Sequence, residues 1–197
     1  VAAPGEPSAL TYDPTRGLAG PLDALASRSE TLKGRRAADD ELLITSGAIE
    51  ALELVGKTFL ERGDTVVVEA PTYLGAILAF AGYQASLTGV GMDEEGMLVD
   101  ELEARFANGY RPKFVYVIPE YQNPSGRTLS LARRSALVDA CRRYGVLIFE
   151  DVAYRELSFD GSSLPTLWSL GPDVVLQAGT FSKVFSPGFR MGWALGP

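Results

Sequence analysis

The 197-residue chain is 46% hydrophobic, which is enough for one α/β domain with a sizeable core, and no apolar run approaches the length of a membrane span. Its 18 basic and 25 acidic residues give a net charge of −7, which disfavours a nucleic-acid-binding surface. The absence of histidine excludes a Ser-His-Asp triad and disfavours a zinc site, and the single cysteine, Cys141, excludes a disulfide framework and fits a reducing, cytoplasmic location.

Helices and strands are predicted to alternate along the chain. Residues 1–14 are rich in Ala, Pro and Gly and are expected to form a loop, followed by one domain over residues 15–197. The predicted helices are Pro21–Leu32, Ala48–Leu60, Leu74–Ala81, Val99–Phe106 and Ser130–Tyr144. The predicted strands are Leu42–Ile44, Thr65–Glu69, Gln84–Thr88, Lys113–Ile118, Val146–Phe149, Val174–Ala178 and Arg190–Leu195. This alternation is typical of a three-layer α/β/α fold with a mostly parallel sheet.

The segment Gly89–Gly96 is predicted to be a connection, because no strand, glycine-rich turn and helix follow one another around it. Its acidic residues Asp93, Glu94 and Glu95 are expected to form a solvated turn.

Thr45-Ser46-Gly47-Ala48 follows the strand-like run Leu42–Ile44 and opens a helix with apolar periodicity. Free backbone N–H groups at a helix start, beside a glycine that permits close approach, can form an anion site. A plain Ser-Gly cap is compatible with the same helix, so this motif alone leaves both interpretations open.

Polar residues follow two buried strands that a helix connects. Asn123 lies in the loop after Lys113–Ile118, and Asp151 and Tyr154 follow Val146–Phe149. Open α/β sheets bind ligands at the carboxyl ends of their strands. We therefore expect Asn123, Asp151 and Tyr154 to converge, together with Lys183 after the next strand.

Lys183 lies in the run Thr180-Phe181-Ser182-Lys183, and Arg190 follows seven residues later. A lysine among small and hydroxylated residues at a strand end suits imine chemistry. Its free pKa of about 10.4 would have to fall through burial or a neighbouring cation. Arg190 is a candidate for that cation or for a clamp on an anion such as a phosphate. Taken alone, a lysine near a strand end is more typical of a solvated surface residue.

These motifs, in this order and spacing, resemble the class I/II aminotransferases, which are pyridoxal-phosphate (PLP) enzymes of fold type I. The likeness runs from about Tyr12 to the last residue, and it is greatest to the branch with 2-aminoadipate aminotransferases and the aminotransferase-like domains of MocR-type regulators. The motifs are Tyr12-x-Pro14-Thr15-Arg16-Gly17-Leu18, Thr45-Ser46-Gly47-Ala48-Ile49-Glu50-Ala51-Leu52, Glu69-Ala70-Pro71-Thr72-Tyr73, Pro119-x-x-Gln122-Asn123-Pro124-Ser125-Gly126, Glu150-Asp151-x-x-Tyr154-Arg155-Glu156-Leu157, and the lysine segment through Gly192-Trp193.

The resemblance implies a role for each residue around the cofactor ring. Lys183 would hold PLP as a Schiff base and move the proton between the substrate Cα and the cofactor. Asp151 would pair with the pyridine nitrogen and keep it protonated. Asn123 and Tyr154 would hydrogen-bond the phenolic oxygen, and Tyr73 would stack on the ring.

The resemblance also implies a phosphate site and a partner subunit. The phosphate would be bound by the helix start and nearby side chains, namely Ser46, Gly47, Ala48, Ile49, Thr180, Ser182 and Arg190. Tyr12 would reach the phosphate in the neighbouring subunit of a homodimer. The family also tends to have cis peptide bonds at Ala70-Pro71 and Asn123-Pro124, which a sequence cannot reveal.

Each assignment has a plainer alternative. Asp151 is also suited to capping a helix, and Asn123 to a turn before Pro124. Tyr154 and Tyr73 are compatible with ordinary aromatic packing, and Tyr12 with a solvent-facing turn.

The first functional hypothesis is a PLP-dependent aminotransferase that moves an amino group between an amino acid and a 2-oxo acid. The alternatives are a PLP-binding sensor domain of a MocR-type transcriptional regulator, or another fold-type I PLP enzyme such as a β-lyase or decarboxylase. Family members continue with an interdomain helix and a small C-terminal domain, which carries the arginine for the substrate α-carboxylate. No residue of this chain is assigned that task, so we expect a fragment, which would bind PLP but lack the group that orients the substrate for transamination.

Overall fold

The computed structural model describes residues 12, 14–33, 35–159, 161 and 163–197. The N-terminal loop expected over residues 1–14 therefore lies outside the described residues, except for Tyr12 and Pro14.

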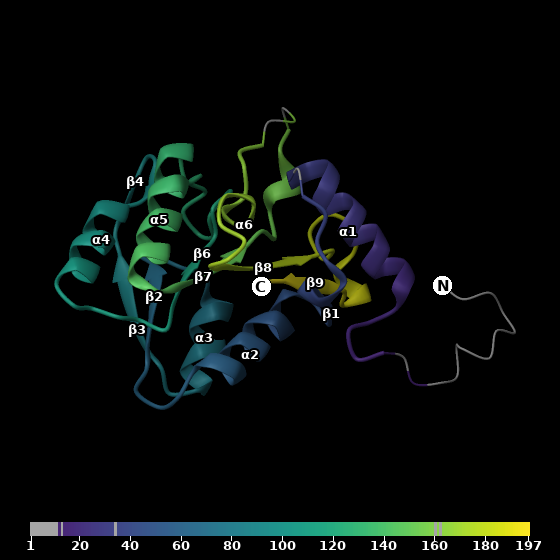
Figure 1. Ribbon diagram of the computed structural model, residues 1–197, viewed down its shortest axis with the longest axis horizontal. Helices are drawn as coiled ribbons and strands as arrows, with labels where there is room; N and C mark the ends of the chain where they lie inside the picture. Colours follow the sequence, from purple (N-terminus) through teal and green to yellow (C-terminus); the bar gives the residue numbers. More distant parts are fainter. Residues whose placement is uncertain (1–11, 13, 34, 160, 162) are drawn as a thin grey trace, which may run out of the picture.

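A seven-stranded sheet forms the middle layer, in the order β1-β9-β8-β7-β6-β2-β3 (Figure 1). Its strands are β1 (Leu42–Thr45), β2 (Thr65–Glu69), β3 (Ser86–Val90), β6 (Phe114–Val117), β7 (Leu147–Asp151), β8 (Val175–Thr180) and β9 (Gly192–Leu195). Strand β9 runs antiparallel to β1 and β8, and the other neighbouring strands pair in parallel. The expected α/β class with a mostly parallel sheet is confirmed.

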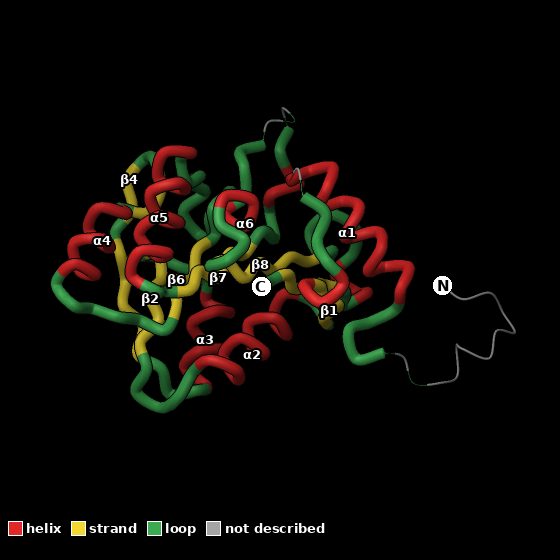
Figure 2. Tube along the Cα trace, viewed as in Figure 1, coloured by secondary structure: helices red, strands yellow, loops and turns green. Residues whose placement is uncertain are grey.

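Helices cover both faces of the sheet (Figure 2). One face carries α1 (Ala19–Lys33), α4 (Val99–Ala107), α5 (Leu131–Tyr144) and α6 (Leu167–Leu170), and the other carries α2 (Ala48–Phe59) and α3 (Leu74–Gly82). Alternate strand residues point to the two sides: Val67 and Val115 pack toward α4 and α5, and Val66 and Phe114 toward α2 and α3. Because both faces are buried, most residues of the central strands are apolar.

Local sequence signals explain why the predicted limits of α5 agree best with the structure. Ser130 precedes α5, and its hydroxyl accepts a hydrogen bond from the Arg133 N–H at 3.4 Å. Gly145 follows the helix with a φ of 67°, a conformation that glycine adopts without steric cost. The predicted limits, Ser130 to Tyr144, are therefore correct to within one residue.

Two predicted strands begin too early. Strand β3 starts at Ser86 instead of Gln84, and β9 starts at Gly192 instead of Arg190. Gln84 and Arg190 have φ values of 58° and 48°, which are left-handed and incompatible with a strand. Strand β7 extends to Asp151, which pairs in parallel with Ala178, and β8 extends to Thr180, which pairs antiparallel with Gly192 of β9.

A β-hairpin replaces the connection predicted over Gly89–Gly96. Strands β4 (Met92–Asp93) and β5 (Gly96–Met97) pair antiparallel. The Arg133 guanidinium of α5 donates to the Asp93 carboxylate at 2.6 Å and to the Gly96 carbonyl at 2.8 Å. Asp93 is therefore anchored by an ion pair, although Glu94 remains exposed.

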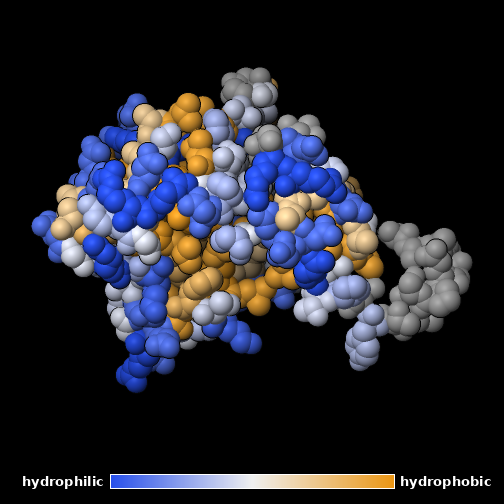
Figure 3. Space-filling view, in the orientation of Figure 1, coloured by the Kyte–Doolittle hydropathy of each residue, from blue (hydrophilic) through white to orange (hydrophobic). Residues whose placement is uncertain are grey.

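The surface in Figure 3 is hydrophilic over α4 and α5 and over α1, with hydrophobic residues gathered between these regions. Within the described residues, no helix combines the length and the apolar character needed to traverse a bilayer. Both peptide bonds named above, Ala70-Pro71 and Asn123-Pro124, are cis.

Candidate active site

One cavity of about 240 Å³ opens at the carboxyl ends of β6, β7 and β8. Most of the residues expected at a cofactor site line it, although they come from distant parts of the chain. Its lining consists of Ala48, Ile49, Tyr73, Ile118, Asn123, Asp151, Ala153, Tyr154, Thr180, Ser182, Lys183, Pro187 and Arg190. Of the expected residues, Ser46 and Gly47 lie directly beside this lining, and Tyr12 lies outside it and is fully exposed.

Asp151 is buried at the end of β7, with 5% of its surface exposed. Its two carboxylate oxygens accept hydrogen bonds from the Tyr116 hydroxyl at 2.9 Å and from the Ala153 N–H at 3.1 Å. Burial raises the pKa of Asp151, and these two hydrogen bonds and the charge of Lys183 lower it in part. The cavity therefore contains a carboxylate that a cation in the cavity would stabilise in its ionised form.

Asn123, Tyr154 and Lys183 form a second group of neighbours. The Asn123 side-chain amide donates to the Tyr154 hydroxyl at 3.2 Å. The Lys183 ammonium lies 5.8 Å from the centre of the Tyr154 ring, close enough for a cation–π interaction. Burial is one of the two ways named above to make this lysine reactive. Lys183 is exposed, so the described residues do not bury it.

Hydroxyl and guanidinium groups gather beside the N-terminus of α2. The Thr180 hydroxyl donates to the Ser182 hydroxyl at 3.0 Å. Arg190 donates to Ser182 Oγ and to the Ser46 carbonyl, both at 3.5 Å. Together with the free N–H groups of the helix start, these side chains make a concentrated set of anion donors.

Gly47 allows this approach. Its φ is 83°, and a Cβ at this position would lie 2.7 Å from Arg190 Nη2. A side chain here would therefore displace the Arg190 guanidinium from the helix start. Glu50, in the first turn of α2, accepts a hydrogen bond from the Ser46 N–H. An acidic residue three positions after the N-cap Gly47 is the sequence signal that predicts such a contact.

Tyr73 borders the cavity from the loop between β2 and α3. Burial raises the pKa of its hydroxyl, as do the charges of Asp151 and Tyr154, whereas Arg190 lowers it. The ring packs so closely over Gly75 that a Cβ there would meet it at 2.4 Å.

Three buried polar residues beneath the cavity were not predicted from the sequence, namely Glu69, Tyr116 and Gln122. The Glu69 carboxylate accepts from the Ile118 N–H at 3.1 Å, and burial raises its pKa to about 8. Gln122 donates through its amide to the Pro71 carbonyl at 2.8 Å, and its amide oxygen accepts from the Ser125 N–H at 2.9 Å. These bonds tie the loop that carries Tyr73 to the loop that carries Asn123.

A buried ionic cluster supports the other side of these loops. Arg134 of α5 is fully buried, and its guanidinium donates to the Glu120 carboxylate at 2.7 Å. Arg155, next to Tyr154, donates to the same Glu120 oxygen. The cluster therefore connects the chain segments that present Asn123 and Tyr154.

The neighbouring carboxylate Glu150 points away from the cavity. It accepts from the N–H groups of Leu167 and Trp168 at 2.7 and 3.0 Å and so caps α6, a helix that the sequence did not predict. Asp151, one residue later, faces the cavity because side chains alternate along a strand.

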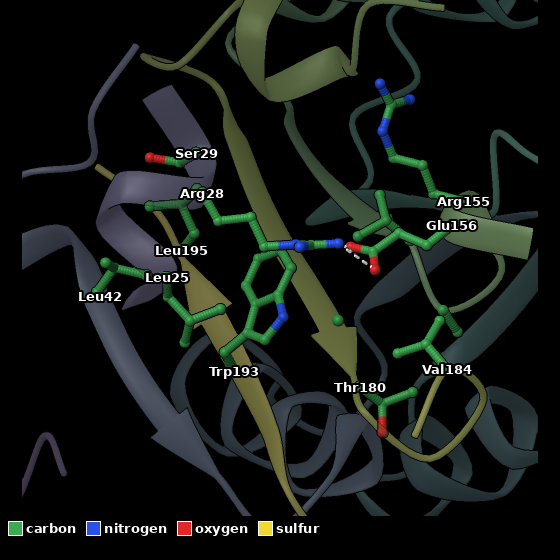
Figure 4. Close-up of a pocket in the computed structure, with 13 residues that line it drawn as sticks. Leu25, Arg28, Ser29, Leu42, Arg155, Glu156, Thr180, Val184, Trp193 and Leu195 are labelled. Atoms are coloured by element: carbon green, nitrogen blue, oxygen red, sulfur yellow. Dashed lines mark hydrogen bonds and ion pairs between the residues drawn. The ribbon is translucent and has the colours of Figure 1, made fainter. Parts of the chain in front are cut away.

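A separate pocket lies between α1 and the strands β8 and β9. Figure 4 shows Arg28 of α1 and Glu156 pointing toward one another, with an ion pair between them, and Trp193 and Leu195 on the neighbouring strand. The pocket shares Ala153 and Thr180 with the cavity but contains neither Lys183 nor Asp151.

The family model for aminotransferase class I and II matches residues 6–197. The chain is 41% identical over 191 residues to the 2-aminoadipate transaminase of Thermus thermophilus, covering 95% of this chain and 46% of that protein. Kynurenine aminotransferase from Pyrococcus horikoshii, solved in complex with PMP, is similar with a TM-score of 0.88 and 39% identity, covering 95% of this chain and 48% of that one. An uncharacterised HTH-type transcriptional regulator of Bacillus subtilis, YdfD, is 33% identical over 191 residues, covering 96% of this chain and 39% of that protein.

The fold and the lysine-containing cavity thus define an α/β protein with a site at the carboxyl edge of its sheet. The chain belongs to the aminotransferase class I and II family. It spans just under half the length of the Thermus thermophilus relative. The regulator matches at lower identity than the transaminase, so the comparisons do not favour the regulator alternative.

Proposed function

We propose that this chain is the PLP-binding large domain of an aminotransferase that moves an amino group between an amino acid and a 2-oxo acid. The observation that carries the proposal is the convergence of Lys183, Asp151, Asn123 and Tyr154 in one cavity, beside the anion donors at the start of α2. The family membership and the similarity to a kynurenine aminotransferase solved with PMP support it.

The donors and acceptors of the cavity fit the polar groups of PLP. The buried Asp151 carboxylate suits a protonated ring nitrogen, and Asn123 and Tyr154 offer hydrogen-bond donors for the phenolic oxygen. Tyr73 offers a ring face for stacking. The phosphate matches the donors Ser46, Gly47, Ala48, Ile49, Thr180, Ser182 and Arg190, with Gly47 leaving the space that Arg190 occupies.

The reaction assigns distinct tasks to these residues. When bound, PLP supplies an electron sink for the negative charge that develops at the substrate Cα. The Lys183 amine would hold the cofactor and would then move the proton between the substrate Cα and the cofactor. Asp151 would keep a positive charge at the ring nitrogen. Arg190 would bind the phosphate and so hold the reacting atoms in position.

We also propose that the domain extends over residues 15–197 and works in a cytoplasmic homodimer. Several large apolar side chains near the cavity are exposed, namely Leu74 and Leu78 of α3 at 64% each, Phe185 at 73% and Phe189 at 69%. A second copy would bury them. Because Tyr12 does not reach the cavity of its own chain, it is available to the phosphate of the partner.

The test is the visible absorption spectrum of the protein, with any sequence that flanks Val1 and Pro197 retained, after loading with PLP and removal of the excess. We expect a retained band, its loss in Lys183→Ala, and reversible bleaching by an amino donor followed by a 2-oxo acid. A borohydride-trapped pyridoxyl adduct on Lys183→Ala at the same stoichiometry would show that the lysine assignment is wrong. A retained band that no amino donor bleaches would contradict transamination and favour a sensor.

A further inference from the structure

The hydroxyl of Tyr116 is buried directly beneath the carboxylate of Asp151. Tyr116 is fully buried in the middle of β6, and its O–H donates to Asp151 Oδ2 at 2.9 Å. Strand β6 pairs with β7, and Tyr116 lies opposite Phe149, two residues before Asp151. Side chains two residues apart in a strand point to the same face, so Tyr116 and Asp151 lie on one face of the sheet.

Packing does not require this hydroxyl. The Tyr116 ring makes edge contacts with Phe80 at 5.7 Å and a tilted contact with Phe149 at 5.8 Å between ring centres, and a phenylalanine would preserve both. All strand neighbours of Tyr116 in β6, Phe114, Val115 and Val117, are apolar. A hydroxyl in this position is costly to bury unless it has a partner, and its partner is Asp151.

From this geometry we propose that Tyr116 is a positioning residue, which holds the Asp151 carboxylate ionised and directed at the ring nitrogen of the cofactor. This inference rests on the proposed function, because it assigns Asp151 to that nitrogen. The carboxylate has one backbone donor, the Ala153 N–H on Oδ1, and Tyr116 on Oδ2. Because Oδ1 is held by the Ala153 N–H and Oδ2 by the Tyr116 hydroxyl of β6, the carboxylate cannot rotate freely.

The charges around this pair explain why a donor is needed. Glu69 and Tyr73 face Tyr116 and Asp151 from the β2 side, and their negative forms oppose a charge on Asp151. Lys183 faces Asp151 from the loop after β8 and favours that charge. Within the described residues, the Tyr116 O–H and the Ala153 N–H are the hydrogen-bond donors to Asp151.

Loss of the hydroxyl has a defined consequence. Asp151 and the ring nitrogen compete for one proton. A hydrogen bond to the Asp151 carboxylate lowers the proton affinity of that carboxylate, so the proton stays on the nitrogen. Without Tyr116 O–H, the proton affinity of Asp151 rises and the proton moves from the ring nitrogen toward Asp151. An O–H donor to a charged group is worth about a factor of ten in such an equilibrium.

The experiment compares wild type, Tyr116→Phe and the control Tyr110→Phe. The Tyr110 hydroxyl is buried, has no hydrogen-bond partner among the described residues and lies outside the cavity lining. Tyr110→Phe therefore removes a buried hydroxyl, as Tyr116→Phe does, but removes no hydrogen bond to Asp151. In the cofactor-free protein, the 13C signal of the Asp151 carboxyl, assigned with Asp151→Asn, reports its titration. We expect an upward shift of about one pKa unit in Tyr116→Phe and none in Tyr110→Phe.

The second arm uses the protein loaded with PLP that is 15N-labelled at the ring nitrogen. We expect the 15N signal of Tyr116→Phe to move toward the value of a neutral pyridine, while attachment to Lys183 and the melting temperature stay close to wild type. An unchanged 15N signal and an unchanged Asp151 titration overturn the inference. If Asp151→Asn loses ring protonation and Tyr116→Phe does not, the proposed function stands and this inference alone fails. If wild type retains no PLP on Lys183, both fail.

Discussion

The Arg190 guanidinium lies where a side chain on residue 47 would have to be. A Cβ on Gly47 would come within 2.7 Å of Arg190 Nη2 and 3.3 Å of its Cζ, although the two residues are far apart in the chain. Strand β9 explains the contact, because it places Gly192 opposite Thr45 and so brings the segment before it next to the start of α2. This one strand pairing therefore brings Arg190 to the start of α2 in the candidate phosphate site.

Gly47→Ala should weaken PLP retention by about tenfold or more. The substitution displaces the flexible Arg190 side chain and imposes a left-handed φ of 83° on a residue with a Cβ, which costs roughly 1 kcal/mol. The measurement is the dissociation constant of PLP by fluorescence titration, beside the free energy of unfolding. Gly63→Ala is the matched control, since its φ is 88° and a Cβ there meets nothing within 4 Å. Equal loss of PLP in both variants would refute the steric explanation.

Asp151→Ala should keep the cofactor attached to Lys183 but reduce turnover by about 100-fold or more, because the positive charge at the ring nitrogen loses its counter-ion. The check is kcat with a saturating amino donor, together with the stoichiometry of the pyridoxyl adduct after borohydride. Asp139→Ala, which removes an exposed carboxylate on α5, should leave both unchanged. If Asp151→Ala turns over at the wild-type rate, Asp151 is a structural residue.

Glu69→Gln should flatten the pH dependence of stability. Burial raises the pKa of Glu69 from 4.5 to about 8, so folding takes up a proton between these values. The stabilising contribution of the protonated group is complete below pH 4.5 and is lost as the pH rises toward about 8, with a slope of at most about 1.4 kcal/mol per pH unit.

Urea unfolding of Glu69→Gln from pH 5 to pH 9 measures this effect, since glutamine is a neutral mimic of the protonated acid. We expect the variant to gain stability relative to wild type as the pH rises. The exposed Glu101→Gln serves as control and should follow wild type. Parallel curves for Glu69→Gln and wild type would mean that Glu69 is ionised in the folded protein throughout.

Arg134→Met should destabilise the domain by about 3–5 kcal/mol, because it leaves Glu120 buried with one partner fewer and frees the carbonyls of Pro119, Leu129 and Pro165. Arg142→Met, on the same helix, removes an exposed pair with Asp173 and should cost at most about 1 kcal/mol. Chemical denaturation of both variants gives the comparison. A similar small loss in each would show that the buried cluster contributes little.

Most of the candidate site could be predicted because each of its residues follows a recognisable strand or opens a recognisable helix. Asp151 and Lys183 follow runs of β-branched and apolar residues, and the carboxyl ends of parallel strands meet at one edge. The residues that were not predicted lie where the sequence pattern indicates only core packing. Tyr116 lies inside a buried strand, where a tyrosine is compatible with ordinary core packing, and only its distance to Asp151 reveals a polar partner.

Two segments show the limits of local patterns. The β4–β5 hairpin has only two residues in each strand, too few for an alternating pattern, and it is held by Arg133 from a helix far along the chain. The composition around Gln84 and Arg190 predicts that strands begin at these two residues, but their left-handed backbone delays the starts of β3 and β9 to Ser86 and Gly192.

The sequence by itself determined the alternation of helices and strands, the order of the motifs and hence the family, because apolar periodicity and turn residues act over a few positions. Only the tertiary structure decided which groups touch. It placed the Tyr116 hydroxyl against Asp151, the Arg190 guanidinium against Gly47, and Glu120 between two arginines. Such contacts depend on strand order and on the antiparallel return of β9, and residues distant in the chain carry no local signal of them.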